Sequence, residues 1–164
     1  MKLRQRVYIE TSVVSYLVAK PSPELIILAR QAVTEHWWRL WRPRYDVFVS
    51  NVVVREAAEG DKEAARLRLE ALSGIPRLPG TPEARILVRM LVRSKAIPLA
   101  AEDDAAHVAL AAVHEMDVLL TWNCRHIANV LAAPKIRDII ERAGYEAPTI
   151  TTPQDLLASM GELP

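Results

Sequence analysis

Short apolar runs alternate along the chain with longer stretches in which apolar residues recur at helical spacing. The runs at 7–9, 46–50, 75–79, 117–121 and 149–151 are typical of strands, and the two prolines of 75–79 indicate an edge strand. The remaining stretches predict helices, at 13–18, 24–42, 51–57, 61–73, 81–96, 101–116 and 134–143, with a final helical turn from 152. The loop at 122–126 is expected to lead into a further helix.

Strands that alternate with helices predict an α/β fold with a parallel sheet. We expect about four to five strands sandwiched between helices in three layers. Repeats, low-complexity segments and linkers are missing from the sequence, so residues 1–164 are expected to form a single domain.

Composition narrows the class of protein without naming it. The chain has 164 residues, 51% of them hydrophobic and 25% charged, which is ordinary for a globular domain. The net charge of +1 argues against binding nucleic acid through bulk charge, although it leaves local contacts open. Cys124 is the only cysteine, so an internal disulfide is excluded. The sequence carries no signal-peptide pattern and no apolar run of about 18 residues. We therefore expect a cytoplasmic protein with no membrane partner.

The run from Val7 to Ser12 combines a buried strand with the start of a helix. Val7, Tyr8 and Ile9 are apolar or aromatic, and Glu10 then places a charge at the carboxyl end of the strand, where ligands bind in open parallel sheets. Thr11 or Ser12 is expected to cap the following helix. Taken alone, Glu10 could equally be an acidic residue in the first turn of a helix, where the helix dipole favours a negative charge.

Other polar residues share the setting of Glu10. Asn123 follows the strand that ends at Thr121, and Asp104 opens the helix that precedes this strand. That helix runs antiparallel to the strand, so its first turn lies at the strand's carboxyl end. Glu10, Asp104 and Asn123 should therefore converge, and Glu56, just after the second strand, is expected to join them.

Carboxylates held close together repel one another unless a cation neutralises them. Oxygen ligands without a cluster of His or Cys select a hard divalent ion, so the predicted cofactor is Mg²⁺ or Mn²⁺. Such a site can activate water and stabilise the negative charge that develops during phosphodiester hydrolysis. It needs no nucleophilic side chain.

Four segments, in their order and spacing, resemble PIN-domain proteins of the type found as VapC toxins in type II toxin–antitoxin pairs. They are Tyr8-Ile9-Glu10-Thr11-Ser12-Val13, Val54-Arg55-Glu56-Ala57 with Gly60-Asp61, the segment from Asp103 to Ala111, and the segment from Leu119 to Ile127. The resemblance covers essentially the whole chain.

The resemblance implies a metal-dependent endoribonuclease that cleaves single-stranded RNA, with an antitoxin partner and a homodimeric assembly. By position, Glu10, Glu56 and Asp104 stand for the family's three metal-ligating acids, and Asn123 for the fourth catalytic position. Three hydroxyl residues match those that support metal-bound water: Thr11, Ser12 and Thr121.

Two positions depart from the family pattern. The first acid is usually Asp and is Glu10 here, and the fourth, often Asp, is the neutral Asn123. Because one charge is missing, we expect one well-held metal. The departures also favour an alternative, in which a catalytically weakened PIN fold serves as a nucleic-acid-binding or dimerisation module.

Several nearby residues have more than one interpretation. His107 lies one turn after Asp104 and is either a packed histidine, a partner of a carboxylate, or an RNA contact. Arg125 is either an RNA phosphate contact or an ordinary exposed residue. Asp103 points away from Asp104 and is expected to be solvated or a cap. Trp37 and its neighbouring tryptophans indicate core packing or a subunit interface, with stacking on nucleic-acid bases as the alternative.

Overall fold

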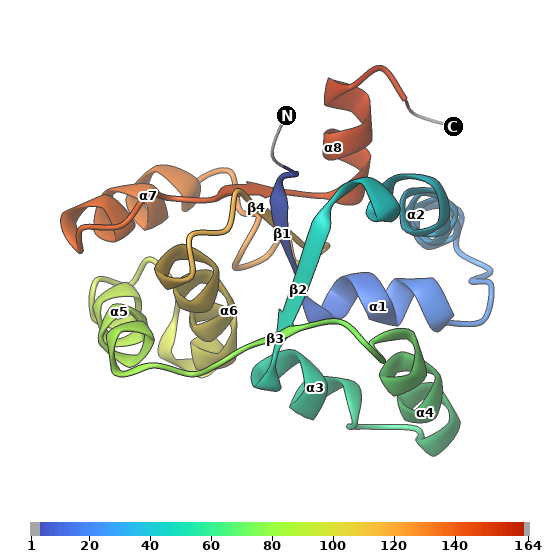
Figure 1. Ribbon diagram of the computed structural model, residues 1–164, viewed down its shortest axis with the longest axis horizontal. Coiled ribbons are helices and arrows are strands. Elements are labelled where there is room, and N and C mark those ends of the chain that lie inside the picture. The colour runs from blue at the N-terminus through green and yellow to red at the C-terminus, as the bar shows by residue number, and fades with distance from the viewer. Residues whose placement is uncertain (1–3, 163–164) are drawn as a thin grey trace.

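The structure is a computed structural model, and it describes residues 4–162. Its centre is a sheet of five parallel strands in the order β3-β2-β1-β4-β5 (Figure 1). The strands are β1 (Arg6–Ile9), β2 (Asp46–Ser50), β3 (Arg77–Leu78), β4 (Val118–Leu120) and β5 (Thr149–Thr151). The predicted parallel sheet is confirmed, including the edge position of the proline-flanked β3.

Strand β1 lies in the middle of the sheet. Tyr8 pairs with Phe48 of β2 on one side and with Leu119 of β4 on the other. Val7, Tyr8 and Ile9 are fully buried because helices cover both faces, which explains their unbroken apolar pattern. The first charged residue after this buried strand is Glu10.

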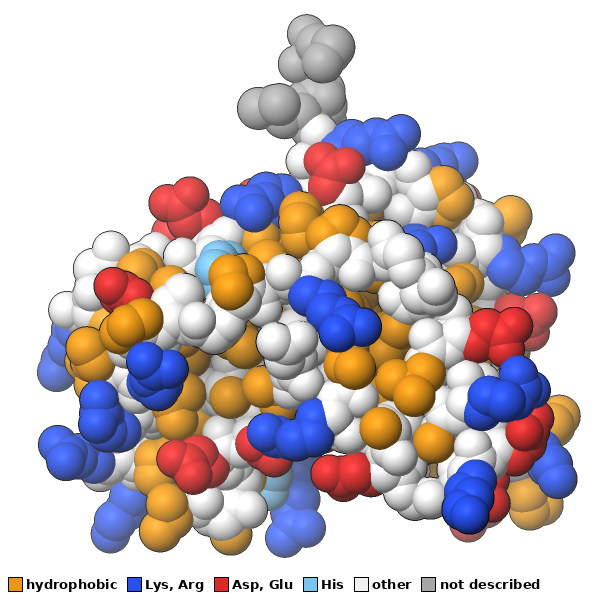
Figure 2. Space-filling model, turned by 60° about the horizontal axis from the view of Figure 1, so that its bottom comes forward, with side chains coloured by type: hydrophobic (Ala, Val, Ile, Leu, Met, Phe, Trp, Pro, Cys, Tyr) orange, Lys and Arg blue, Asp and Glu red, His pale blue; other side chains and the backbone are white. Residues whose placement is uncertain are grey.

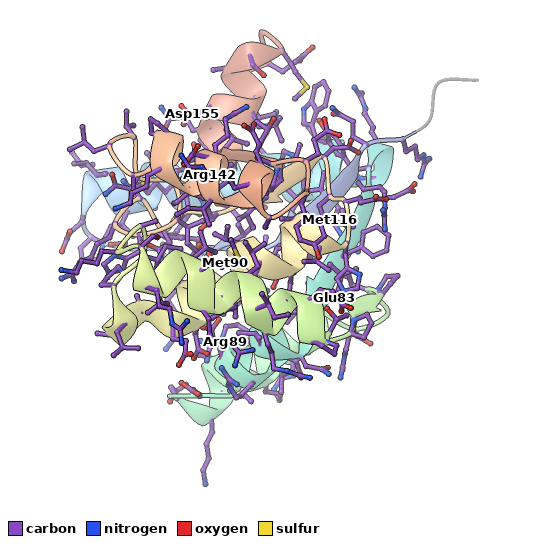
Figure 3. The ribbon with its side chains drawn as sticks, turned by 90° about the vertical axis from the view of Figure 1, so that its left-hand side faces the viewer. Glu83, Arg89, Met90, Met116, Arg142 and Asp155 are labelled. Carbon is purple, nitrogen blue, oxygen red and sulfur yellow. The ribbon has the colours of Figure 1, made fainter. Side chains whose placement is uncertain are left out.

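Within residues 4–162, eight α-helices surround the sheet, and they are α1 (Thr11–Val18), α2 (Leu25–His36), α3 (Asn51–Ala57), α4 (Lys62–Ala71), α5 (Pro82–Arg93), α6 (Glu102–Val113), α7 (Ala133–Arg142) and α8 (Pro153–Ser159). Figure 1 shows α5, α6 and α7 on one face and α1, α2, α4 and α8 on the other. Figure 3 views the molecule from the first of these faces. Helices α7 and α5 lie side by side there, and the labels Arg142 and Met90 mark them. The predicted three-layer α/β arrangement is therefore confirmed.

All five strands run in one direction, so their carboxyl ends form a single edge, and β1 and β2 run downward toward it in Figure 1. Helices α1 and α3 begin directly at this edge, after β1 and β2. The first turn of α6 also lies there, because α6 returns toward the start of β4. This topology brings residues from distant parts of the sequence to one place.

The long helix predicted over 24–42 is wrong in its second half. Helix α2 ends at His36, a π-helical turn covers Trp37–Trp41, and a 3₁₀ turn that contains Pro43 follows. Trp37 is fully buried and stacks on Tyr45 with ring centroids 5.9 Å apart. The wider turn fits this large side chain into the core, so the core-packing interpretation holds for Trp37.

The α3 helix begins at Asn51, as predicted, and is capped by Ser50, whose Oγ accepts a hydrogen bond from the Val53 N–H at 3.4 Å. One smaller prediction needs correction. The helix expected after 122–126 is a series of turns up to α7. Among the described residues, no helix combines the length and the apolar character needed to span a bilayer.

Candidate metal centre

Glu10 stands between β1 and α1 with its backbone fixed on both sides. Its N–H donates to the Leu120 carbonyl at 3.0 Å, and its carbonyl accepts from the Val13 N–H at 3.1 Å. Because the backbone is held by the sheet and by the first turn of α1, the side chain has a defined direction. The residue is only 5% exposed, so its carboxylate is nearly removed from water.

Hydroxyl donors compensate the buried charge of Glu10. Thr121, just after β4, donates from Oγ1 to Oε2 of Glu10 at 2.6 Å, and the Ser12 hydroxyl donates to the same oxygen. Ser12 Oγ in turn accepts from the Trp122 N–H at 2.7 Å. The expected capping role of Thr11 or Ser12 is therefore wrong, because both hydroxyls face carboxylates and α1 has no side-chain cap.

Glu56 approaches Glu10 from α3 and is half-buried. Its Oε2 accepts hydrogen bonds from the Thr11 hydroxyl and from Nε2 of His107, the latter at 3.0 Å. Thr11 and Ser12 are consecutive residues of α1, and they hold Glu56 and Glu10 respectively. The first turn of α1 thus fixes the relative position of the two carboxylates.

His107 completes the group from α6 and is fully buried. Its Nε2 lies 3.0 Å from Glu56 Oε2 and 4.0 Å from Glu10 Oε1, and its Nδ1 lies 2.8 Å from the Tyr8 hydroxyl. One ligand atom from each of Glu10, Glu56 and His107 falls within 4.8 Å of the others. An RNA contact by His107, one of the three interpretations, does not fit its burial, whereas contact with a carboxylate does. The sequence indicated this contact, because His107 lies one helical turn after Asp104 and therefore on the same face of α6.

The close packing of these groups changes their acidity. Burial alone would raise the pKa of Glu56, but the hydrogen bonds from His107 and Thr11 and the charge of His107 lower it below its ordinary value. Burial alone would lower the pKa of His107, but Glu56 and the charges of Glu10 and Asp104 raise it. The carboxylates thus favour the protonated form of His107, and His107 favours the ionised form of Glu56.

Tyr8 extends the group into the core. Its hydroxyl lies 2.7 Å from Ser50 Oγ and 2.8 Å from Nδ1 of His107. Burial raises the pKa of Tyr8 far above its ordinary value, so the hydroxyl stays protonated and neutral. A neutral hydrogen-bonded pair, Tyr8 and Ser50, thus supports the side of the imidazole that faces away from the carboxylates.

Asp104 lies at the predicted edge but outside the tight group of Glu10, Glu56 and His107. It is half-buried, and its charge reaches His107 from the same helix. Together with His126 it lines a hollow of about 450 Å³ beside the start of α6. Asp103 is exposed, as expected, and forms an ion pair of 2.6 Å with Arg55.

Asn123 also lies at the end of β4, but its side-chain oxygen is already used. Asn123 Oδ1 accepts a hydrogen bond from the His126 N–H at 3.0 Å, and the Asn123 N–H donates to Thr121 Oγ1 at 2.9 Å. The side chain thus closes the turn after the strand. Arg125, in the same turn, is exposed.

The surface around this edge carries side chains of both charges. Figure 2 brings the edge forward and shows basic and acidic side chains interspersed with apolar ones. This distribution agrees with the net charge of +1. Any recognition of a polyanion here depends on local contacts.

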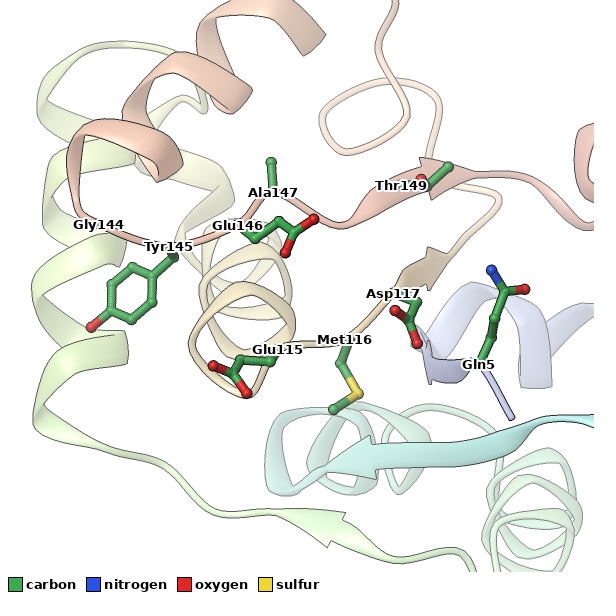
Figure 4. Close-up of a pocket in the computed structure, with 9 residues that line it drawn as sticks. All are labelled: Gln5, Glu115, Met116, Asp117, Gly144, Tyr145, Glu146, Ala147 and Thr149. Atoms are coloured by element: carbon green, nitrogen blue, oxygen red, sulfur yellow. The ribbon is translucent and has the colours of Figure 1, made fainter. Parts of the chain in front are cut away.

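A larger hollow, of about 540 Å³, lies at the opposite edge of the sheet (Figure 4). The carboxylates of Glu115, Asp117 and Glu146 line it, and Asp117 Oδ2 accepts from the Arg6 N–H at 2.7 Å. All three residues are exposed. This hollow therefore holds acidic side chains in contact with water.

Comparison with known proteins bears on the fold. No family model matches the sequence, and no curated protein matches it. A solved structure, VapBC2 from Rickettsia felis bound to a DNA fragment from their promoter, contains a chain that superimposes with a TM-score of 0.58. The match covers 90% of this chain and 98% of that chain, at 13% sequence identity. This chain has the PIN fold.

At this identity the likeness concerns the fold alone. It agrees with the PIN resemblance of the four sequence segments and with the five-stranded parallel sheet. In the PIN fold of this chain, Glu10, Glu56, His107, Asp104 and Asn123 all lie at the carboxyl edge of the sheet.

Proposed function

We propose that this PIN-fold protein is a metal-dependent endoribonuclease that hydrolyses single-stranded RNA, and that it is the toxin of a toxin–antitoxin pair. The observation that carries the proposal is the pair of carboxylates, Glu10 and Glu56, held together at the carboxyl edge by hydroxyl donors. Folding charges this close together is costly, and the arrangement is explained if it serves to hold a cation.

The residues present fit a divalent ion such as Mg²⁺ or Mn²⁺. Within residues 4–162, Oε1 of Glu10 and Oε1 of Glu56 accept no hydrogen bond, so each carboxylate keeps one oxygen for a ligand. We assign the metal to Glu10, Glu56 and Asp104. A divalent ion bound there would supply a Lewis acid that activates water and neutralises charge on the phosphate.

The neighbouring side chains orient these ligands. Thr121 and Ser12 fix Glu10, and Thr11 fixes Glu56, in both cases through hydrogen bonds to Oε2. Asn123 holds the turn after β4 and thereby the Thr121 hydroxyl, to which its N–H donates. Arg125, exposed in that turn, is proposed to contact an RNA phosphate.

We also propose protein partners for this chain. The proposed partner is a cognate antitoxin. This chain shares its fold with a chain of VapBC2, which was solved with a fragment of promoter DNA. Helix α2 begins with two large apolar residues that face solvent, Leu25 at 82% and Ile26 at 73% exposure. This surface is suitable for an antitoxin segment or for the partner subunit of a homodimer.

Two observations favour the alternative, a catalytically weakened PIN fold that acts as a binding or dimerisation module. The carbonyl oxygen of Asn123 is engaged by the His126 N–H, and Asp104 stands outside the tight group. If both positions are structural, the metal would lack ligands on one side.

Cleavage of single-stranded RNA with Mn²⁺ or with EDTA tests the proposal. Asp104→Asn and Glu10→Gln should each lose at least about a hundredfold in rate, since loss of residues that merely support metal ligands already costs 10–100-fold. Asp103→Asn is the matched control, because it removes the adjacent but exposed carboxylate, and it should cleave like the parent.

The outcomes separate the two functions. Cleavage that requires both the metal and Asp104 supports the nuclease. Cleavage by Asp104→Asn at the parent's rate would show that this residue lies outside the site. No cleavage of a broad RNA panel, together with no stabilisation by Mn²⁺, would favour the binding module.

A further inference from the structure

We infer that His107 is itself a ligand of the divalent ion, so that a nitrogen donor joins the proposed oxygen ligands Glu10, Glu56 and Asp104. This inference rests on the proposed metal centre and goes beyond its acidic ligands. It also predicts which ions the centre prefers.

The distances between the ligand atoms fit one shared ion. Ligands at about 2.1 Å from a metal lie about 3.0 Å apart at right angles and about 4.2 Å apart on opposite sides. His107 Nε2 is 3.0 Å from Glu56 Oε2 and 4.0 Å from Glu10 Oε1. A cation shared by His107 Nε2, Glu10 Oε1 and the Glu56 carboxylate therefore requires only small movements of side chains, in which His107 exchanges its contact with Glu56 Oε2 for the ion.

The other ring nitrogen is held as it usually is in metal-binding histidines. Such residues typically donate Nδ1–H to a second group, which fixes the ring and leaves Nε2 for the metal. Here Nδ1 lies 2.8 Å from the Tyr8 hydroxyl, which lies 2.7 Å from Ser50 Oγ. Nδ1–H can donate to Tyr8, and the Tyr8 hydroxyl can then donate to Ser50. Nε2 is left facing the carboxylates.

Burial removes the simplest competing use of this imidazole. His107 has no exposed surface and cannot meet substrate from solvent, whereas Glu56 beside it is 23% exposed at the side chain. The remaining alternative is that Nε2 keeps donating to Glu56 while the metal binds oxygen atoms only. Both arrangements share the 3.0 Å distance, so spectroscopy of the bound ion must separate them.

A nitrogen ligand changes the choice of metal. Mg²⁺ strongly prefers oxygen, whereas imidazole raises the affinity for transition ions. The centre should therefore bind Mn²⁺ and Co²⁺ more tightly than Mg²⁺, by roughly tenfold or more. Removing the imidazole should reduce this preference.

The decisive experiment is electron spin-echo spectroscopy of Mn²⁺ bound to the full chain. A coordinated imidazole gives nitrogen modulation, which changes when the protein contains ¹⁵N-labelled histidine. The chain has four histidines, so the signal is assigned with His107→Gln. His126→Gln is the matched control, because His126 lines the adjacent hollow beside Asp104.

Support for the inference is nitrogen modulation in the parent and in His126→Gln that disappears in His107→Gln. Tyr8→Phe provides a second readout that retains the ligand. It should keep the modulation and weaken Mn²⁺ binding by about 10–100-fold, as removal of a supporting hydrogen bond does at other metal sites. It also serves if His107→Gln fails to fold.

Each contrary result has a distinct meaning. Bound Mn²⁺ without histidine modulation would overturn the role of His107 while leaving the proposed metal-dependent nuclease intact. Modulation that survives in His107→Gln, or a Mn²⁺ affinity unchanged in Tyr8→Phe, would also overturn it. No Mn²⁺ binding by the parent would overturn both proposals.

Discussion

The two edges of the sheet both carry acidic side chains, but they hold them differently. At the carboxyl edge, Glu10 is 5% exposed and receives two hydroxyl donors, and Glu56 receives a hydroxyl and an imidazole. At the amino edge, Glu115 and Glu146 are exposed beside the larger hollow. Water solvates these carboxylates, so no cation is needed to explain them.

The difference shows that neither the number of acidic residues nor the size of a hollow identifies a metal centre. A buried carboxylate is costly unless donors and a counter-charge compensate it. Within residues 4–162, four elements build this compensated group at the carboxyl edge: β1, α1, α3 and α6, with Thr121 after β4. Like charges that are held together by surrounding donors indicate function more strongly than the number of acidic residues or the size of a hollow.

The largest expected contrast between the edges is stabilisation by metal. At a Mn²⁺ concentration of about a hundred times Kd, the parent should gain about 2.7 kcal/mol in free energy of unfolding. Glu10→Gln should lose most of this gain, whereas Glu146→Gln, at the amino edge, should keep it. Thermal unfolding with and without Mn²⁺ measures the effect. If Glu146→Gln abolished the gain and Glu10→Gln retained it, the metal would bind at the amino edge and the proposed centre would be contradicted.

The convergence of residues at the carboxyl edge could be predicted from the sequence. A run such as Val7–Ile9 followed by Glu10 specifies both a buried parallel strand and a charge at its end, and strand direction then determines the edge. Glu10, Glu56, Asp104 and Asn123 all lie at that edge, as the topology required. Their roles in metal binding and catalysis stay predictions.

The details within a few ångströms could not be predicted in the same way. Periodicity places His107 on the face of Asp104, but it does not say that Tyr8 turns the imidazole toward the carboxylates. Thr11 and Ser12 match helix caps locally, but the Thr11 hydroxyl donates to Glu56 of α3 and the Ser12 hydroxyl donates to Glu10. The π-helical turn at Trp37–Trp41 likewise depends on the core that receives Trp37.

The carboxyl edge should also give the metal-free protein a pH dependence that the amino edge does not. The pKa of His107 is raised from 6.5, so its contribution to stability is complete below 6.5 and is lost as pH rises through the raised pKa. The pKa of Glu56 is lowered from 4.5, so its contribution is present above 4.5 and is lost as pH falls through the lowered pKa. In EDTA the group should stabilise the fold most between these values.

Urea unfolding in EDTA, from about pH 5 to about pH 9, measures this dependence. The charges facing His107 are Glu10 and Glu56 from other elements and Asp104 from its own helix. The parent should lose stability relative to His107→Gln as pH rises, and Glu146→Gln should follow the parent. Parallel curves for the parent and His107→Gln would contradict the raised pKa of His107.

The smallest expected effect is at the amino edge, where a substitution should stabilise the fold instead of weakening it. Glu115 follows the end of α6 with a positive φ of 55°, where its N–H donates to Ala112 and the Met116 N–H donates to Ala111. Glycine is the usual residue at this position of a helix end, as at Gly144 after α7, because it has no Cβ to clash. Glu115→Gly should therefore raise the free energy of unfolding by up to about 1 kcal/mol.

Lys95 provides the matched control, since it occupies the same position after α5 with a φ of 60°. If Glu115→Gly and Lys95→Gly stabilise the fold by similar amounts in urea unfolding, the backbone accounts for the gain and the Glu115 carboxylate contributes nothing. If Glu115→Gly instead destabilises the protein while Lys95→Gly does not, the carboxylate has a role at the hollow. The amino edge would then need the same scrutiny as the carboxyl edge, where removing a carboxylate is expected to cost metal binding.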